Sequence, residues 1–257
     1  MKETGNKKKT DSIKTLSIFS NPDGFTFFES SQGKHQTYKL KIEAPVDFPE
    51  SFETFVSDHG WASDESLSVR ITEYGDRFML LPAEITDQKQ IHTFFDFNHT
   101  HVNGNALQTK PLCDGKQIFC YDISSSRISC YKSIFPKFEL NNNAFALTEW
   151  TFNDAAERQG NTFVAYLSGK SMQLFAANAS GLLFANSFHI QSSSEATYFF
   201  LRSMEQLGLD PFETKCMICA DPEKASQFIN SLRPYIQNLE MVTFTFQADN
   251  CLQSVNN

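Results

Sequence analysis

Gly169-Lys170-Ser171 is the stretch whose residue types suggest chemistry most directly, because it matches the last three positions of a phosphate-binding P-loop. A P-loop also needs a glycine five residues before the Gly-Lys pair and a helix directly after it, so that backbone N–H groups and the helix dipole surround the phosphates. Val164 stands at that glycine position. The segment after Ser171 is short and ends in another turn, which favours a strand, although propensity alone would tolerate a short helix. We therefore predict a β-hairpin that turns at Gly169 and Lys170.

Histidine and cysteine pairs could bind a metal, but their surroundings argue against it. His99 and His101 lie in a polar segment, and no further ligand stands at a spacing that zinc or nickel would use. Cys216 and Cys219 have CxxC spacing, yet they fall in a predicted strand, where residues three apart point to opposite faces. We predict solvated histidines and buried, reduced cysteines.

Asp122 is a further candidate because of its place in the chain. It ends a short apolar stretch that we predict to be a strand, and ligands of open α/β sheets collect at the carboxyl ends of strands. Its carboxylate either faces a cleft or caps the helix that follows Ser124.

Composition narrows the class of protein. The chain has 257 residues, 40% of them hydrophobic, with 26 phenylalanines, which is enough for one large or two ordinary packed domains. A net charge of −8 argues against nucleic-acid binding, which needs a basic surface. No apolar run is long enough for a membrane span or a signal peptide, so we expect no membrane span and a cytoplasmic protein. Residues 1–13 are polar, with Lys7 to Lys9 as a basic run, and we expect a disordered tail there.

The first half of the chain, residues 14–160, begins with three strands separated by turns at Asn21–Gly24 and Ser31–Gly33. Alternating helices and strands follow, and they include a strand pair turning at Gly75-Asp76 and a polar loop over residues 98–115. The predicted helices lie between Pro49 and Gly60, from about Asp87, over 126–134 and over 143–159; further strands end at Asp122 and surround Phe138.

The second half restarts with three strands, over 162–168, 172–178 and 182–189. A capping box at Ser192 and Glu195 opens a helix that stops at Gly208, and a strand, a helix after Pro222 and a last strand complete the pattern. Because both halves begin with a meander and then alternate, we predict a duplicated α/β unit. The lobes span residues 14–160 and 161–246, with a C-terminal tail over 247–257.

This order resembles the actin-like ATPase superfamily, which has a duplicated ribonuclease H-like fold and includes sugar kinases, heat-shock ATPases and pilus-assembly actin homologues. More closely, residues 163–211, from FVAYLSGKSMQLF to MEQLGLDP, resemble a family of uncharacterised bacterial proteins assigned that fold. The segments FMLLPAEI and SIFPKFEL resemble the first half of the same family, so the resemblance spans about residues 14 to 245. The resemblance implies an α/β fold of two lobes, each with a mixed sheet. It implies no particular activity, because the family has none assigned.

In the superfamily, the first turn of each lobe clamps the nucleotide phosphates, an Asp at each first strand end directs Mg²⁺ or water, and a Gly-Gly pair lies beside the adenosine. The turns that the resemblance indicates, together with Asp122 at its strand end, give seven candidate cleft residues: Asp23, Gly24, Asp122, Ser168, Gly169, Lys170 and Ser171. The match degrades where chemistry would occur. Pro22 removes a backbone donor, the second turn has no carboxylate, and Ala220-Asp221-Pro222 replaces the glycine pair.

We therefore expect an interaction or regulatory module with degenerate nucleotide-binding motifs, no cofactor and an unknown protein partner. The alternative is a nucleotide-binding ATPase or phosphotransferase that uses ATP with magnesium, held by Asp23 and Asp122 in the interlobe cleft. A third hypothesis is a protein that binds a small molecule between the lobes without phosphate chemistry. If neither turn binds anything, Asp-Gly and Gly-Lys are simply hairpin residues chosen for positive φ.

Overall fold

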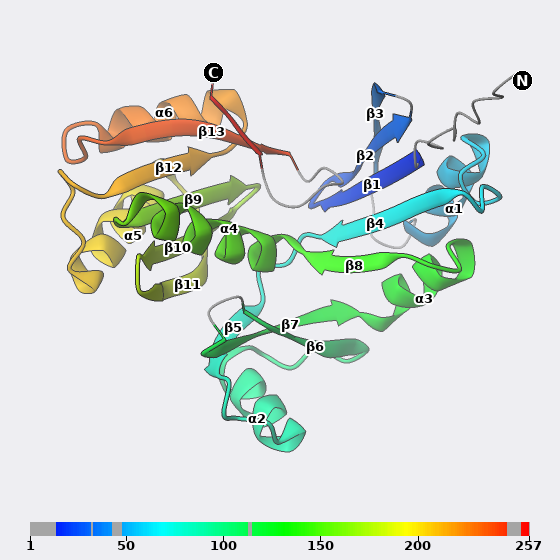
Figure 1. Cartoon of the computed structure of the whole chain (residues 1–257), viewed down its shortest axis with the longest axis horizontal. Coiled ribbons are helices and arrows are strands. Elements are labelled where there is room, and N and C mark those ends of the chain that lie inside the picture. Colours follow the sequence, from blue (N-terminus) through cyan, green and yellow to red (C-terminus); the bar gives the residue numbers. More distant parts are fainter. Residues whose placement is uncertain (1–13, 32, 43–47, 113–114, 246–252, 257) are drawn as a thin grey trace, which may run out of the picture.

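The computed structural model describes residues 14–31, 33–42, 48–112, 115–245 and 253–256. These residues form two large sheets, each with helices, and a small third sheet beside them (Figure 1). The expected tail over residues 1–13 lies outside the described residues. The predicted actin-like architecture of two lobes is confirmed, and the third sheet is an addition to it.

The first lobe contains a five-stranded sheet in the order β3-β2-β1-β4-β8. The meander consists of β1 (Lys14–Asn21), β2 (Gly24–Ser31) and β3 (Lys34–Lys41), and β4 (Leu67–Glu73) and β8 (Glu139–Asn142) extend it in parallel with β1. Because side chains alternate along a strand, Leu16 and Ile18 of β1 point to one face, where they pack with residues of α1 (Phe48–Asp58) and α3 (Ser125–Ile134). The turn between β1 and β2 lies at the end of the sheet where β4 and β8, parallel to β1, also finish.

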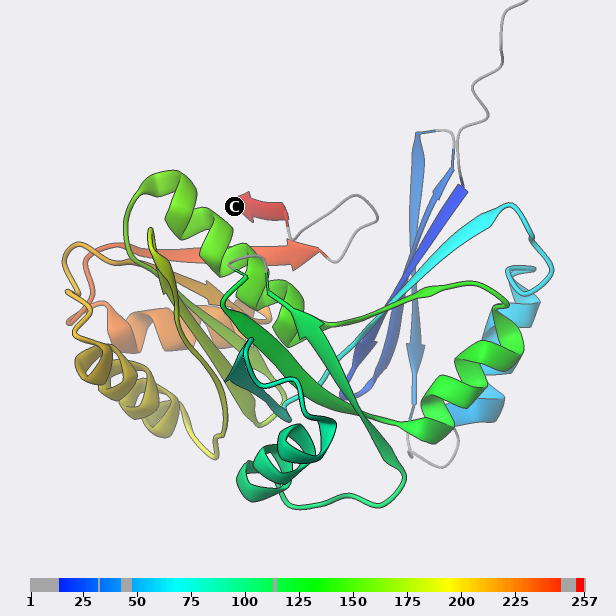
Figure 2. The same cartoon turned by 60° about the horizontal axis from the view of Figure 1, so that its bottom comes forward.

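The second lobe repeats this order as β11-β10-β9-β12-β13, with β14 added at the edge. Its strands are β9 (Thr162–Ser168), β10 (Ser171–Asn178), β11 (Gly181–His189), β12 (Lys215–Cys219), β13 (Leu239–Thr245) and β14 (Gln253–Asn256). One face is covered by α5 (Ser193–Leu207) and α6 (Pro222–Leu232), whereas α4 (Asn143–Arg158) packs on the other (Figure 2). Strand β14 falls within the segment 247–257 that the sequence assigned to a tail.

The third sheet, in the order β5-β7-β6, is inserted between β4 and α3. It consists of β5 (Phe78–Pro82), β6 (Asn105–Pro111) and β7 (Gln117–Ser124), with α2 (Gln88–Asn98) between β5 and β6. Two predictions were wrong here. Strands β4 and β5 do not form a hairpin, because β4 pairs with β1 and β8 while β5 pairs with β7. The expected polar loop over 98–115 contains β6, an edge strand that pairs only with β7 and so needs few apolar residues.

The inserted sheet and the second lobe share one hydrophobic core. The Phe78 ring of β5 stacks on Phe119 of β7 at 5.3 Å between centroids and on Phe175 of β10 at 6.0 Å. Buried residues from α4, including Ala144 and Leu147, belong to the same cluster. Phe19 of β1 belongs to it as well, so the insertion is packed against both lobes.

Candidate functional site

The turn between β9 and β10 is a two-residue hairpin, as predicted. Ser168 pairs with Ser171, and Gly169 has φ of 58°, the conformation that a hairpin with glycine at its first central position requires. Lys170 is exposed, and Ser171 begins a strand instead of a helix. The Gly-Lys-Ser stretch is therefore not a P-loop.

The turn between β1 and β2 is also a tight hairpin, in which Asn21 pairs with Gly24. Gly24 has φ of 142°, and a Cβ atom there would lie 2.0 Å from the Leu40 carbonyl oxygen of β3, so only glycine fits. Asp23 is exposed and does not line a described pocket. Positive φ thus falls on Gly24 and Gly169, and not on Asp23.

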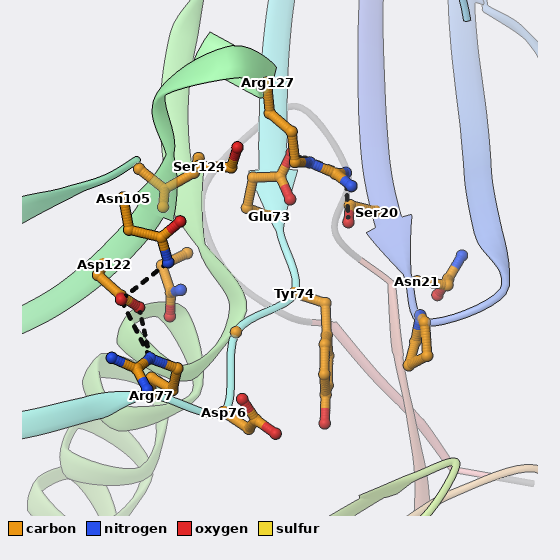
Figure 3. Close-up of a pocket in the computed structure, with 14 residues that line it drawn as sticks. Ser20, Asn21, Glu73, Tyr74, Asp76, Arg77, Asn105, Asp122, Ser124 and Arg127 are labelled. Atoms are coloured by element: carbon orange, nitrogen blue, oxygen red, sulfur yellow. Dashed lines mark hydrogen bonds and ion pairs between the residues drawn. The ribbon is translucent and has the colours of Figure 1, made fainter. Parts of the chain in front are cut away.

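A pocket of about 290 Å³ lies where β1, β4 and β8 end and the inserted sheet begins (Figure 3). This is the edge of an α/β sheet at which ligands usually bind. Most of its lining side chains are polar, and five are charged: Glu73, Asp76, Arg77, Asp122 and Arg127. The remaining lining residues are Ser20, Asn21, Pro22, Tyr74, Gly75, Asn105, Ile123, Ser124 and Asn142.

Arg127, in the first turn of α3, forms one side of the pocket together with Glu73. Its Nε donates to Glu73 Oε1 at 3.0 Å, and its Nη2 donates to Ser20 Oγ at 3.1 Å and to the Tyr131 hydroxyl at 3.1 Å. Tyr131 in turn donates to Glu73. Burial lowers the pKa of Arg127, but Glu73 and Tyr131 together raise it by more, so the pKa is raised and the guanidinium stays charged.

The Arg127 guanidinium also lies over two aromatic rings, at 4.5 Å from the centroid of Phe48 and 5.1 Å from that of Phe25. Burial, and secondarily the Glu73 charge, raise the pKa of Tyr131 well above its ordinary value, so its hydroxyl remains a proton donor. This cluster is held from several directions, and it fixes the Arg127–Glu73 pair in one geometry.

Arg77 and Asp122 form the second ion pair of the pocket. Arg77 Nε donates to both carboxylate oxygens of Asp122, at 3.2 and 3.0 Å, and Asn105 Nδ2 donates to one of them at 2.9 Å. The Asp122 side chain is 8% exposed, so the pair is largely removed from water. Asp122 therefore accepts from Arg77 and Asn105, and makes no cap to the helix after Ser124.

Residues 73–77, the linker between β4 and β5, also join the two lobes. The Gly75 N–H donates to Asn143 Oδ1 at 2.9 Å, Asn143 Nδ2 donates to Gln173 Oε1 at 2.8 Å, and Gln173 Nε2 donates back to the Gly75 carbonyl at 2.7 Å. The three groups form a closed ring of hydrogen bonds, which we call the junction ring. Asn143 and Gln173 are both fully buried. The ring links the first lobe directly to β10 of the second.

Tyr74 lies beside the junction ring and faces the second lobe. Its ring lies 6.4 Å from that of Tyr166 in β9, with Ser171 nearby. Burial raises the pKa of Tyr74 to about 12, and Ser171 lies near its buried hydroxyl, which makes no hydrogen bond of ordinary geometry among the described residues. None of the four predicted residues of the second turn lines the pocket, although Ser171 lies beside Tyr74, which does.

The sequence identified Asp122 but missed Glu73, Arg77 and Arg127, the other members of the two ion pairs. The signal available was weak: a charged residue directly after an apolar strand, and arginines soon after strand ends. His99 Nε2 donates to the Phe78 carbonyl oxygen, 3.0 Å away. Cys216 and Cys219 are buried in β12 without a disulfide. Among the described residues, no group of three His, Cys, Asp or Glu side chains is placed to hold a metal ion. The described helices include none long and apolar enough to cross a membrane.

Two solved structures resemble the chain over nearly its full length. A protein from Bacteroides thetaiotaomicron VPI-5482, with an actin-like ATPase fold and unknown function, matches with a TM-score of 0.79 and 16% identity, over 93% of this chain and 94% of that one. The PilM-PilN type IV pilus biogenesis complex matches with a TM-score of 0.54 and 10% identity, over 91% and 89%. At these identities the similarity establishes the fold alone.

No curated protein matches the sequence. The model of the family described as "Protein of unknown function (DUF3822)" matches residues 3–239, which confirms the resemblance to a family of uncharacterised proteins. The chain therefore belongs to the DUF3822 family.

Proposed function

We propose that the chain is an interaction or regulatory module that has the actin-like ATPase fold and does not hydrolyse nucleotide. The observation that carries this proposal is the junction ring of Gly75, Asn143 and Gln173. Enzymes that close two lobes around a ligand need an interface that can open. Here, opening would break the two hydrogen bonds of Gly75, to Asn143 and to Gln173, and also separate Phe78 from Phe175. We infer that the lobes keep one relative orientation.

The charges near the strand ends give further support. The pocket is lined by three carboxylates, Glu73, Asp76 and Asp122, against two guanidinium groups, Arg77 and Arg127. A triphosphate needs metal ions and an excess of positive charge. Asp23, which the alternative hypothesis uses to hold magnesium, is exposed on the hairpin, and Asp122 is already paired with Arg77. Both features favour a module without phosphate chemistry over an ATPase.

The interaction part of the proposal draws on the PilM-PilN structure, in which a chain of similar fold is assembled with another protein. We propose that this chain also has a protein partner, and that it works in the cytoplasm. The free cysteines Cys120, Cys130, Cys216 and Cys219 suit a reducing compartment.

The test of the first part is phosphate release from ATP with magnesium, measured for the natural chain and for Asp23→Ala, together with thermal unfolding in the same buffers. We expect no turnover above the blank and no shift in Tm on adding nucleotide. Turnover, or a rise in Tm that Asp23→Ala abolishes, would instead support the ATPase hypothesis.

The test of the second part is quantitative co-purification from the cells that produce the protein, with two matched surface variants. Phe97 in α2 is 89% exposed and Phe212 of the second lobe is 64% exposed, so Phe97→Ser and Phe212→Ser both leave the core intact. A partner that binds one defined surface of the protein should fail to co-purify with at most one of the two variants. A set of proteins that is equally reduced with both variants, or no stoichiometric partner at all, contradicts the interaction proposal.

A further inference from the structure

Two ion pairs leave the pocket with little charge to offer a ligand. Glu73 is paired with Arg127 at 3.0 Å and Asp122 with Arg77 at 3.0 Å. The fifth charged residue, Asp76, is exposed, so water screens its carboxylate. An ionic ligand would therefore gain little from the pocket, and a polyphosphate would meet a net negative wall.

The same groups keep unused hydrogen-bonding capacity of both kinds. Arg77 uses only its Nε, and Arg127 uses Nε and Nη2, so three terminal amino groups have no partner among the described residues. Glu73 accepts only at Oε1, which leaves its second oxygen free within the described part of the chain. Asn105 donates to Asp122 and leaves its amide oxygen as an acceptor. The walls thus offer donors and acceptors side by side.

A hydroxyl group is the ligand group that suits such walls, because it donates one hydrogen bond and accepts others. Hydrogen bonds from a neutral hydroxyl to an ionised side chain are stronger than those between neutral groups, and ion pairing holds the guanidinium and carboxylate planes in place beforehand. A cavity of about 290 Å³ has the volume of about ten water molecules, which is the size of a monosaccharide or a cyclitol. Most of its lining side chains are polar, so an apolar ligand would leave these groups unpaired.

We propose that this pocket binds a small uncharged molecule that is rich in hydroxyl groups, as the effector of the module. The inference rests on the proposed regulatory function and names its ligand class. A ligand in the pocket contacts Glu73, Asp76 and Arg77, and the two residues between them, Tyr74 and Gly75, contact the second lobe. Ligand binding would then directly change the hydrogen-bond geometry of the junction ring.

The test is calorimetry and ligand-observed NMR on the full chain with defined probes: D-glucose and myo-inositol as hydroxyl-rich molecules, choline as a cation, succinate as an anion and ATP with magnesium. We expect binding of at least one hydroxyl-rich probe and weaker or absent binding of the three ionic probes. Asn105→Ala removes one acceptor from the pocket and the hydrogen bond that Asn105 donates to Asp122. It should therefore weaken the affinity for the hydroxyl-rich probe by about tenfold or more. Asn153→Ala, an exposed asparagine on α4, is the matched control and should leave binding unchanged.

Because Asn105→Ala could also reduce stability, Asp76→Ala serves as a second variant on an exposed side chain, with thermal unfolding recorded for each. It removes an acceptor from the pocket wall without breaking a described hydrogen bond, so it should weaken binding of the hydroxyl-rich probe while Tm stays unchanged. Failure of both hydroxyl-rich probes to bind, tighter binding of an ionic probe, or equal binding by Asn105→Ala would overturn the inference. A chain that still captures a protein partner while binding neither probe would refute this inference and leave the proposed function intact.

Discussion

The junction ring makes a quantitative prediction for Gln173. Replacing Gln173 by methionine keeps the length of the side chain and removes both of its hydrogen bonds, to Asn143 and to the Gly75 carbonyl. Because Gln173 is 0% exposed, these two partners are left buried and unpaired. Each orphaned group costs about 1–3 kcal/mol, so we expect a loss of about 4 kcal/mol in the free energy of unfolding. In a chain of this size that lowers Tm by roughly 8 to 16 °C.

A double-mutant cycle separates the ring from a general loss of packing. Asn143→Leu alone orphans the Gly75 N–H and the Gln173 oxygen, also at about 4 kcal/mol. The double variant orphans only the two backbone groups of Gly75, so it should again cost about 4 kcal/mol instead of the sum of about 8. Urea unfolding measures all three, with Gln206→Met, an exposed glutamine of α5, as the control. If the single losses simply add, the three groups do not act as a ring, and the inference that the lobes are fixed loses its support.

Three further predictions concern the turns, the insertion and the buried ion pair. Gly24→Ala should destabilise the chain by more than about 3 kcal/mol, because the added Cβ would meet the Leu40 carbonyl. Gly169→Ala should cost only about 1–2 kcal/mol in the same urea assay, because Gly169 has φ of 58° but open space around the position of a Cβ. The Lys110 ammonium donates to the Leu140 carbonyl and to Asn141, and burial lowers its pKa, so the folded chain holds this proton less tightly than the unfolded chain. The free energy of unfolding, relative to that of Lys110→Met, should therefore rise with pH from the lowered pKa up to the ordinary value of 10.5. A difference between the two proteins that does not change with pH would contradict this. Glu73→Gln should lower the free energy of unfolding by about 3 kcal/mol, because Arg127 loses its counter-charge in a buried cluster. Glu139→Gln, at the exposed Arg70–Glu139 pair, is the comparison, and an equal or smaller loss for Glu73→Gln would refute this prediction.

The sequence predicts the repeated parts of the fold well, because local signals decide them. The first two strands of each meander carry apolar residues on either side of a glycine-containing turn. The helix after Ser192 has a cap that the structure reproduces, with Ser192 Oγ accepting from the Glu195 N–H at 3.2 Å. The C-terminal stop at Gly208 is equally local, since this residue adopts φ of 64°. For these elements, burial and capping point to the same conformation.

The insertion was hidden because non-local pairing decides it. Tyr74-Gly75-Asp76 has the composition of a hairpin turn, yet β5 pairs with β7, a strand that lies more than thirty residues later in the chain. Strand β6 is polar because only one of its edges and part of one face are covered, and Lys110 in β6 is held by β8 of the first lobe. Neither partner can be inferred from the residues of β5 or β6 alone. The candidate site shares this difficulty, because each of its ion pairs joins residues at least 45 positions apart.

The short linker over residues 73–77 is where these non-local contacts meet. Glu73 and Arg77, at its two ends, belong to the two ion pairs of the pocket, and Gly75 in the middle belongs to the junction ring. A Cβ atom on Gly75 would lie 2.8 Å from Asn142 Nδ2, so the linker also packs tightly against the start of α4. A linker tethered at both ends and at its centre cannot shift at one point without straining the others, because its backbone hydrogen bonds are buried. A ligand that reorients Arg77 would therefore change the geometry at Gly75, and amide exchange of the Gly75 N–H, which donates to Asn143, is the direct measure of that coupling.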